Sequence, residues 1–307
     1  MAEAQWLEVS MWVENGELAE AVAEILSRYV QNGVATEREA IHAVGYDTGV
    51  AVGAYHVFGY LPVDENLEQV RQQLSEALWH LNLIQPMPEP TFKTIHDQNW
   101  MEAWKEHFHP IPVGERLMIV PAWIENPDPS RLPISIDPNM AFGTGTHPTT
   151  QLCMVLLEKY AMPGQPVIDL GCGSGILSIA AVKLGMPQVV AVDIEMDSVN
   201  ATQENAERNG VLEAIQVGQG SVKEILAGEY ALKNAPLLLV NILATIIVRL
   251  FDEQLVELIQ PGGIGLFSGI LDERETDFLE KAKANGLQVL ERQKQGDWVA
   301  FAMRREV

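Results

Sequence analysis

The second half of this chain has a regular pattern of apolar and polar positions. Short apolar runs such as PVIDL, QVVAVD, PLLLVN and IGLFSG are strand-like, and stretches with helical spacing separate them. Such alternation favours a mostly parallel sheet covered by helices. The last two runs, LQVLERQ and WVAFAMR, flank Gly296-Asp297, which indicates a hairpin and an antiparallel end. We therefore expect an α/β fold with a Rossmann-like, mostly parallel sheet of seven strands.

The same half contains one long predicted helix and one weak strand. The run ILATIIVRLFDEQLVELI is predicted as one helix that ends at the PGG turn of 261–263. The strand near 213–217 is weak, and a loop with Ser221 follows it.

The first ninety residues have a different pattern. WLEVSMWV and VAVGAYHVFGYLP are strand-like, whereas ELAEAVAEILSRYVQ and NLEQVRQQLSEALWHL have helical spacing. This order predicts a small ferredoxin-like α+β domain, although a strand after Val34 is difficult to place. The segment has no glycine phosphate loop, metal-ligand spacing or catalytic pairing, which favours a recognition role for it.

Prolines concentrate between these halves, in PMPEP, HPIPVGE, NPDPSRLP and IDP. Proline fixes φ, so a semi-rigid connector is expected. Within it, NWMEAWKEHFH predicts a short helix with Trp100, Trp104 and Phe108 on one face, an arrangement more typical of packing than of a ligand site. We assign residues 1–90 to a recognition domain, 91–140 to this linker and 141–307 to a catalytic domain.

The candidate chemistry centres on residues 166–175, PVIDLGCGSG. An apolar run breaks into Gly171, Gly173 and Gly175, and a helical pattern follows. Glycines lack the Cβ atoms that would keep a ligand off the backbone, so a nucleotide-like molecule can lie against such a turn. The next strand ends in Asp193, whose carboxylate is suited to the two hydroxyls of a ribose.

The spacing separates two cofactor classes. A dinucleotide fingerprint that begins at Gly171 requires glycine or alanine at position 176, which is Ile176. The order G-x-G-x-G after Asp169 instead resembles the first motif of the class I methyltransferases, which use S-adenosylmethionine (AdoMet). A purely structural glycine turn in another α/β protein is the alternative.

A second glycine-rich segment, AFGTGTHPTT, precedes a helical pattern at 148–160. Pro148 suits the first turn of that helix, with Thr146 or His147 as its cap. Backbone N–H groups and hydroxyls at a helix start also suit a carboxylate, such as the methionine end of AdoMet. We therefore include Phe142 and Thr144 among the candidate cofactor-binding residues, with Gly173.

Net charge narrows the choice of partners. The chain has 20 basic and 42 acidic residues, a formal charge of −22, and residues 1–90 hold 3 basic and 14 acidic residues, a net of −11. Such a surface repels phosphates, so we expect no direct nucleic-acid binding. A basic protein would be attracted, although solubility alone would also account for the charge.

Cysteine content and apolar runs bear on location. Cys153 and Cys172 are too few for a disulfide framework or a zinc site. No apolar run is long enough to span a membrane, and the acidic N-terminus lacks the features of a signal peptide. We expect a cytoplasmic protein without a metal or a membrane partner.

A narrower resemblance rests on FGTGTHPTT, DLGCGSG, AVDIE and VNIL, together with NWMEAWKEHFHP before them. These motifs closely resemble the PrmA family of ribosomal protein methyltransferases, which act on the eleventh protein of the large subunit. The similarity is strong over about 92–303 and rests on domain layout over 1–90. It implies trimethylation of amino groups, the α-amine and lysine side chains, with the first domain gripping the substrate protein and the linker letting the catalytic domain reorient.

The resemblance places the AdoMet contacts on Thr150, Gly171, Asp193 and Asn241. Glu195 stands where relatives often have aspartate, a mild departure. Asn241 is the first residue of the sequence N-I-L-A. Methyltransferases that act on nucleobases or glutamine amides have N-P-P-Y at this strand end, so the difference argues against a planar base or amide as the methyl acceptor.

Methyl transfer from a sulfonium mainly requires alignment with a neutral amine. A lysine amine has a pKa near 10.4, so the site must favour its neutral form. We name Asn241 and His147 as the candidate catalytic residues, although capping would also account for His147. The alternatives are a class I methyltransferase with another protein or small-molecule acceptor, an AdoMet-binding regulator without activity and, more weakly, a dehydrogenase.

Overall fold

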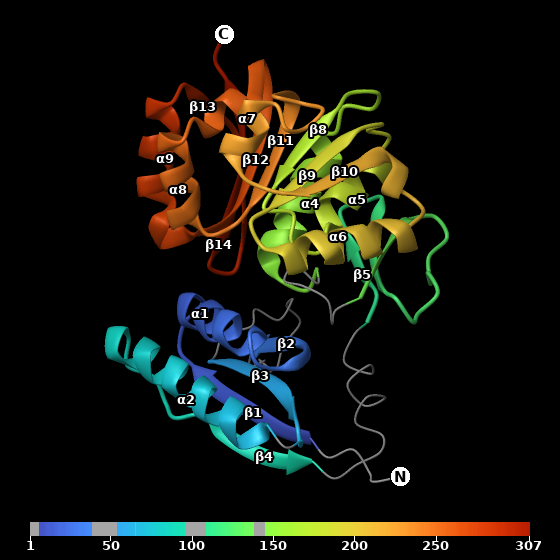
Figure 1. The fold of residues 1–307 in the computed structure, drawn as a ribbon. Coiled ribbons are helices and arrows are strands. Elements are labelled where there is room, and N and C mark those ends of the chain that lie inside the picture. The colour runs from blue at the N-terminus through green and yellow to red at the C-terminus, as the bar shows by residue number, and fades with distance from the viewer. Residues whose placement is uncertain (1–5, 39–53, 65, 96–108, 138–144) are drawn as a thin grey trace, which may run out of the picture. The chain divides into compact units, whose positions relative to one another are not determined.

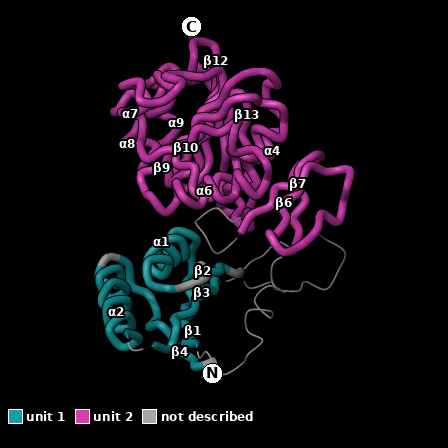
Figure 2. The backbone as a smooth tube through the Cα atoms, turned by 45° about the vertical axis from the view of Figure 1, so that its right-hand side comes forward, with its two compact units in different colours: residues 1–108 teal, residues 109–307 magenta. Residues whose placement is uncertain are grey.

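The computed structural model describes residues 6–38, 54–64, 66–95, 109–137 and 145–307. The chain divides into two compact units, Met1–Phe108 and His109–Val307, drawn in teal and magenta in Figure 2. Within the described residues, no helix has the length and apolar character that crossing a membrane requires.

The first unit combines one antiparallel sheet with two helices (Figure 1). Its elements are, in chain order, β1 Trp6–Val13, α1 Gly16–Ser27, β2 Gln31–Arg38, β3 Tyr55–Pro62, α2 Leu67–Ile84 and β4 Thr91–Ile95. The strand order is β2-β3-β1-β4, and every neighbouring pair is antiparallel. This is the expected ferredoxin-like βαββαβ arrangement.

Alternation along β1 places the core of this unit on one face of the sheet. Val9, Met11 and Val13 are buried there and pack in one cluster with apolar residues of both helices, among them Leu18 and Leu74. The other face of the sheet carries the intervening residues of β1 and β3.

The strand that was difficult to place is β2. Its register with β3 shifts between Gln31 and Val34. A register shift interrupts the two-residue period on which strand prediction depends, which accounts for the weak signal.

Strands also occupy the described part of the interval 91–140, which was expected to be a linker. β4 completes the sheet of the first unit by pairing with β1. β5 Ile111–Val113, β6 Leu117–Pro121 and β7 Leu132–Ile136 form a three-stranded sheet that belongs to the second unit. The predicted helix with Trp100, Trp104 and Phe108 lies outside the described residues.

The second unit contains the predicted alternation of strands and helices. Its remaining helices are α4 Pro148–Tyr160, α5 Ile176–Lys183, α6 Met196–Arg208, α7 Val222–Ala227, α8 Ala244–Asp252 and α9 Glu275–Ala284, with short 3₁₀ turns at Leu212–Ala214, Leu255–Leu258 and Asp272–Arg274. Its remaining strands are β8 Val167–Leu170, β9 Val189–Asp193, β10 Ile215–Gln219, β11 Ala235–Asn241, β12 Ile259–Leu271, β13 Leu287–Gln295 and β14 Trp298–Arg305.

These seven strands form one sheet in the order β10-β9-β8-β11-β12-β14-β13. β14 is antiparallel to both of its neighbours, and the other pairs are parallel. Side chains of β8 alternate between two buried clusters, with Val167 in one and Ile168 in the other. Both faces of the sheet are thus covered, which is why its strands read as continuous apolar runs.

The long helix predicted after β11 is wrong in its second half. α8 ends at Asp252, and Gln254 adopts a left-handed conformation with φ 69°. A helix cannot continue through such a residue. β12 then begins at Ile259, and the PGG segment forms an irregularity within it, because Ala235 pairs with Ile259 whereas Leu237 pairs with Ile264.

Candidate functional site

Three strand ends meet at one edge of the large sheet. β8 pairs with β9 on one side and β11 on the other (Figure 1). Val192, Leu170 and Val240 lie in one register row. The next residue on each strand is therefore Asp193, Gly171 and Asn241. An edge at which the strand order reverses is the usual ligand site of such sheets.

The turn after β8 requires glycine at three positions. The φ values of Gly171, Gly173 and Gly175 are 76°, 54° and 78°. Residues with a Cβ atom rarely adopt such positive values. A Cβ on Gly171 would lie 2.5 Å from Cγ2 of Ile242, and one on Gly175 would lie 2.8 Å from Cγ2 of Thr202. The turn therefore approaches the neighbouring elements closely and presents bare backbone at the sheet edge.

Asp193 is held in place beside this turn. Gly173 donates its backbone N–H to Oδ2 at 2.9 Å, and Glu195 donates its own to Oδ1 at 3.0 Å. Each carboxylate oxygen keeps further acceptor capacity. A fixed, half-buried acceptor at a strand end suits a pair of hydroxyl groups.

Asn241 lies against the start of α4. Its Nδ2 is 3.4 Å from Oγ1 of Thr150, which is wholly buried. Ser268 of β12 donates to the carbonyl of Thr149 at 2.8 Å and ties the helix start to the sheet. The structure thus brings together Thr150, Asn241, Gly171 and Asp193, although they are up to 91 positions apart in sequence.

His147 caps α4, and Pro148 is the first residue of that helix, as predicted. Its Nδ1 accepts the backbone N–H of Thr149 at 3.3 Å and lies 2.8 Å from the Thr149 hydroxyl. The ring contacts Trp298 edge to face, with centroids 4.9 Å apart. Burial lowers the pKa of His147 to about 4, so the imidazole is neutral near pH 7. Phe142 and Thr144, also predicted as site residues, lie outside the described residues.

Asp169 adds a buried carboxyl group under the turn. It is fully buried, and Ser178 donates its hydroxyl to Oδ2 at 2.6 Å. Oδ1 has no hydrogen-bond partner among the described residues. Burial, and secondarily the charge of Asp193, raises the pKa of Asp169 to about 7. The sequence marked Asp169 as part of the motif but gave no sign of its unsatisfied oxygen.

Sequence reasoning missed two exposed apolar side chains beside Asp193. Ile194 is 64% exposed and Met196 is 48% exposed. The sequence signal that could have identified them is the presence of apolar residues directly after the acid at the strand end. Together they give the edge an apolar border next to the carboxylate, as a flat aromatic ligand would require.

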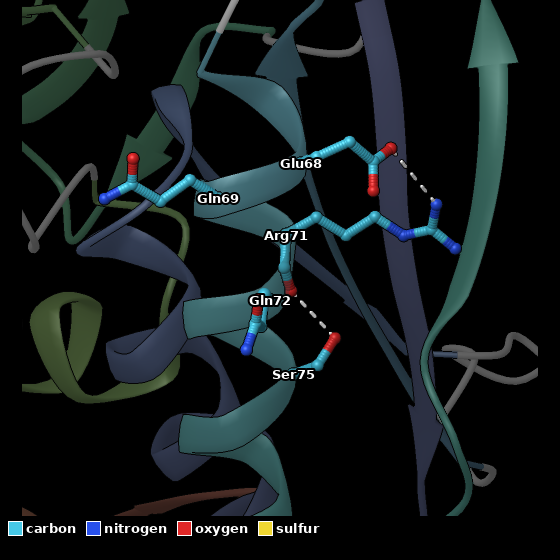
Figure 3. Close-up of a pocket in the computed structure, with 5 residues that line it drawn as sticks. All are labelled: Glu68, Gln69, Arg71, Gln72 and Ser75. Atoms are coloured by element: carbon cyan, nitrogen blue, oxygen red, sulfur yellow. Dashed lines mark hydrogen bonds and ion pairs between the residues drawn. The ribbon is translucent and has the colours of Figure 1, made fainter.

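Besides the sheet edge, two other features of the described residues bear on the location of the site, namely possible metal-ligand groups and a hollow on α2. Among the described residues, no three His, Cys, Asp or Glu side chains are grouped as metal ligands would be. A hollow of about 590 Å³ on α2 is lined by Glu68, Gln69, Arg71, Gln72 and Ser75 (Figure 3). Several of its polar groups already have partners on the same helix, since Arg71 lies 3.7 Å from Glu68, Ser75 donates to the Arg71 carbonyl and Gln72 donates to Glu76.

Three features of the second unit define the class I methyltransferase fold. The sheet is mostly parallel with an antiparallel strand, β14, next to its edge. A glycine turn follows β8, and β9 ends in an acid, Asp193. The ribosomal protein L11 methyltransferase (PrmA) family matches residues 5–306. The chain belongs to this family.

Individual relatives agree with this assignment. The ribosomal protein L11 methyltransferase of Chloroflexus aurantiacus is 39% identical, and the match covers 99% of each chain. That of Pelotomaculum thermopropionicum is 37% identical over 98% of this chain and 99% of its own. The crystal structure of ribosomal protein L11 methylase from Lactobacillus delbrueckii subsp. bulgaricus is similar with a TM-score of 0.58 and 34% identity, over 65% of this chain and all of that one.

Proposed function

We propose that this chain transfers methyl groups from AdoMet to amino groups of ribosomal protein L11, namely the α-amine and lysine ε-amines. The substrate is the one that the names of its relatives give. The register row that places Asp193, Gly171 and Asn241 side by side is the observation that carries the proposal.

The residues at the sheet edge fit each part of the cofactor. Asp193 would accept the ribose hydroxyls, and the apolar side chains of Ile194 and Met196 would border the adenine. Gly171 and Gly173 allow the positive φ values with which the turn presents bare backbone to the cofactor. The unsatisfied Oδ1 of Asp169 provides an acceptor for a cationic or N–H group beneath the turn.

The methionine end would be bound at the start of α4. Backbone N–H groups at a helix start favour a carboxylate, and Thr150 supplies a hydroxyl next to Asn241. Phe142 and Thr144 belong to the same proposed set.

The bound cofactor supplies an electrophilic methyl group, so the protein has to align a neutral amine with it. Asn241 is the residue that we propose for this alignment, because its amide lies at the strand end and its side-chain oxygen can accept an N–H of the incoming amine. His147 uses Nδ1 in the helix cap. Capping accounts for that contact, and a polar role for His147 near the amine stays a prediction.

Mass spectrometry of purified ribosomal protein L11, incubated with the enzyme and AdoMet, tests the proposal. We expect mass increases of whole methyl groups, located by fragmentation on the α-amine and on lysines. Asp193→Ala should reduce them strongly at an AdoMet concentration near the dissociation constant of the wild type. If the ribosomal protein stays unmodified while the enzyme methylates another protein in a cell extract, the chain has a different acceptor.

A further inference from the structure

Two residues, Ile242 and Leu243, connect the strand end at Asn241 to α8, which begins at Ala244. Neither of them is a proline, which would fix φ. Leu243 occupies the N-cap position of α8 with an apolar side chain that cannot accept a hydrogen bond. Packing therefore has to hold this short connection in place.

The side chain of Ile242 packs against the glycine turn. The atom nearest to a Cβ built on Gly171 is Cγ2 of Ile242, at 2.5 Å. The branched methyl group of Ile242 thus fills the space that a side chain at position 171 would take. The same side chain is partly buried against the core cluster that contains Val240 and Ile247.

The backbone of Ile242 meets a second glycine, Gly269 of β12. Gly269 has φ 82°, and a Cβ built on it would overlap the carbonyl oxygen of Ile242 and lie 2.7 Å from its carbonyl carbon. A side chain at position 269 would therefore displace the Ile242 peptide group. We refer to the contacts of Ile242 with Gly171 and Gly269 as the Ile242 clamp.

The close approach of Gly269 coincides with a β-bulge. The register of β12 against β14 shifts between Phe267 and Ile270, so Ser268 and Gly269 together oppose one residue of β14. On the other edge of β12, Ser268 is the register partner of Asn241. The bulge therefore lies level with the strand end that carries the proposed aligning residue.

The glycine turn has supports of its own. Thr202 of α6 donates its hydroxyl to the carbonyl of Gly173 at 2.9 Å, and Asn205 donates its amide to the carbonyl of Ser174 at 2.9 Å. Because these bonds hold the turn from α6, it is a fixed reference against which Ile242 can set the strand end.

We propose that Ile242 is a positioning residue, which sets Asn241 relative to the cofactor through the clamp. This inference rests on the proposed function, in which Asn241 aligns the incoming amine. A misplacement of about 1 Å can lower a rate by about a hundredfold. Release of the clamp should therefore slow methyl transfer far more than it weakens AdoMet binding, since Asp193 and the turn stay in place.

The test compares two substitutions of Ile242 in the full-length enzyme. Valine is smaller than isoleucine but keeps the branched Cγ2, whereas leucine keeps the volume of isoleucine and lacks that branch. If Ile242 only fills space, Ile242→Leu is the milder change. If Cγ2 sets the strand end, Ile242→Val is the milder change.

The kinetics of methyl transfer to ribosomal protein L11 are measured at saturating AdoMet. In Ile242→Leu we expect kcat to fall about ten- to a hundredfold, whereas KM for the ribosomal protein and the AdoMet dissociation constant stay close to the wild-type values. Ile242→Val should keep most of kcat.

Gly269→Ala tests the second contact of the clamp. Gly164→Ala is the matched control, because Gly164 has φ 84° and nothing lies within 4 Å of an added Cβ. Both alanines carry the backbone strain of a positive φ, but only the one at position 269 displaces Ile242. We expect a lower kcat in Gly269→Ala and the wild-type kcat in Gly164→Ala. If Gly269→Ala does not fold, the two Ile242 variants decide.

Amide hydrogen exchange of residues 239–246, measured with AdoMet bound, gives a readout that needs no methyl transfer. Exchange should be faster in Ile242→Leu than in the wild type and Ile242→Val. This pattern, in an enzyme whose wild type methylates no ribosomal protein, would reject the proposed function and retain the clamp.

Three results would overturn the inference. The first is an active wild type in which Ile242→Leu keeps kcat at least as well as Ile242→Val. The second is a loss in Ile242→Leu that lies in AdoMet affinity and not in kcat, which would make Ile242 a support of the cofactor turn alone. The third is an inactive wild type with equal exchange in the two Ile242 variants.

Discussion

Gly173 and Asp193 are joined by a hydrogen bond from the glycine N–H to the carboxylate, with a length of 2.9 Å. The turn that leaves the backbone open and the acid at the next strand end therefore form one unit. A change in either residue alters the position of the other, so the ligand site depends on both.

Asp193→Ala should lower AdoMet affinity by about one to two orders of magnitude, because it removes hydrogen bonds to a charged group and releases the N–H groups of Gly173 and Glu195. Isothermal calorimetry measures the affinity. Asp197→Ala is the control, since Asp197 is exposed in the first turn of α6. Equal affinities for wild type and Asp193→Ala would contradict the assignment of the ribose site.

Gly171→Ala should reduce both stability and AdoMet affinity, and Gly171→Arg should abolish binding. The residue has φ 76°, and a Cβ would lie 2.5 Å from Ile242. Gly210→Ala separates the two effects, because Gly210 has φ 68° with nothing within 4 Å of an added Cβ. It should lose about 1 kcal/mol of stability and bind AdoMet normally. Urea unfolding and calorimetry provide the comparison.

His147→Asn should keep the cap of α4, whereas His147→Ala should cost about 1 kcal/mol. If capping is the main role, the Asn variant will have nearly wild-type kcat. A large loss of kcat in the Asn variant, with stability retained, would instead support a role near the amine.

The same histidine predicts an acid dependence. Its pKa is about 4 in the folded protein and 6.5 ordinarily, so the unfolded chain binds more protons between these values. The stability contributed by neutral His147 is present above pH 6.5 and is lost as the pH falls toward 4. Urea midpoints at pH 7.5 and 5.0 should differ more for the wild type than for His147→Asn.

Asp169 should act in the opposite sense. Its pKa is raised from 3.8 to about 7, so the stability of its protonated form is present below pH 3.8 and is lost as the pH rises through 7. Asp169→Asn should therefore gain stability over the wild type as the pH increases from 5 to 8.5. Asp197→Asn, an exposed change, should show no such trend in urea midpoints.

Deletion of residues 1–108 should preserve AdoMet binding and abolish methylation of the ribosomal protein. Deletion of 1–90 follows the boundary expected from the sequence but retains β4, which would lack its partner β1. An unpaired strand promotes association, so the shorter deletion should aggregate more, as light scattering can measure. Full-rate methylation by a truncated enzyme would reject a recognition role for the first unit.

Much of the fold could be predicted because local patterns agree with it. The runs that became β8, β9 and β11 are continuous and apolar, and the large sheet buries both faces of its strands. The glycine turn and Asp193 were identified because positive φ and a strand-end carboxylate leave a signature at fixed positions.

The remaining features depend on tertiary structure. Gln254 adopts φ 69° without being glycine, so nothing local marked the end of α8. β5 to β7 are short and rich in proline, and they read as a linker until their pairing is known. The contact of Asn241 with Thr150 and the unsatisfied oxygen of Asp169 arise only when segments far apart in sequence come together.

The edge-to-face contact of His147 with Trp298 has a consequence for synthesis of the protein. Translation produces the start of α4 long before Trp298, the first residue of β14. β14 also inserts between β12 and β13. A nascent chain can tie the helix start to β12 through Ser268, but the His147–Trp298 contact and the β12-β14-β13 edge of the sheet form only after the last hairpin has left the exit tunnel.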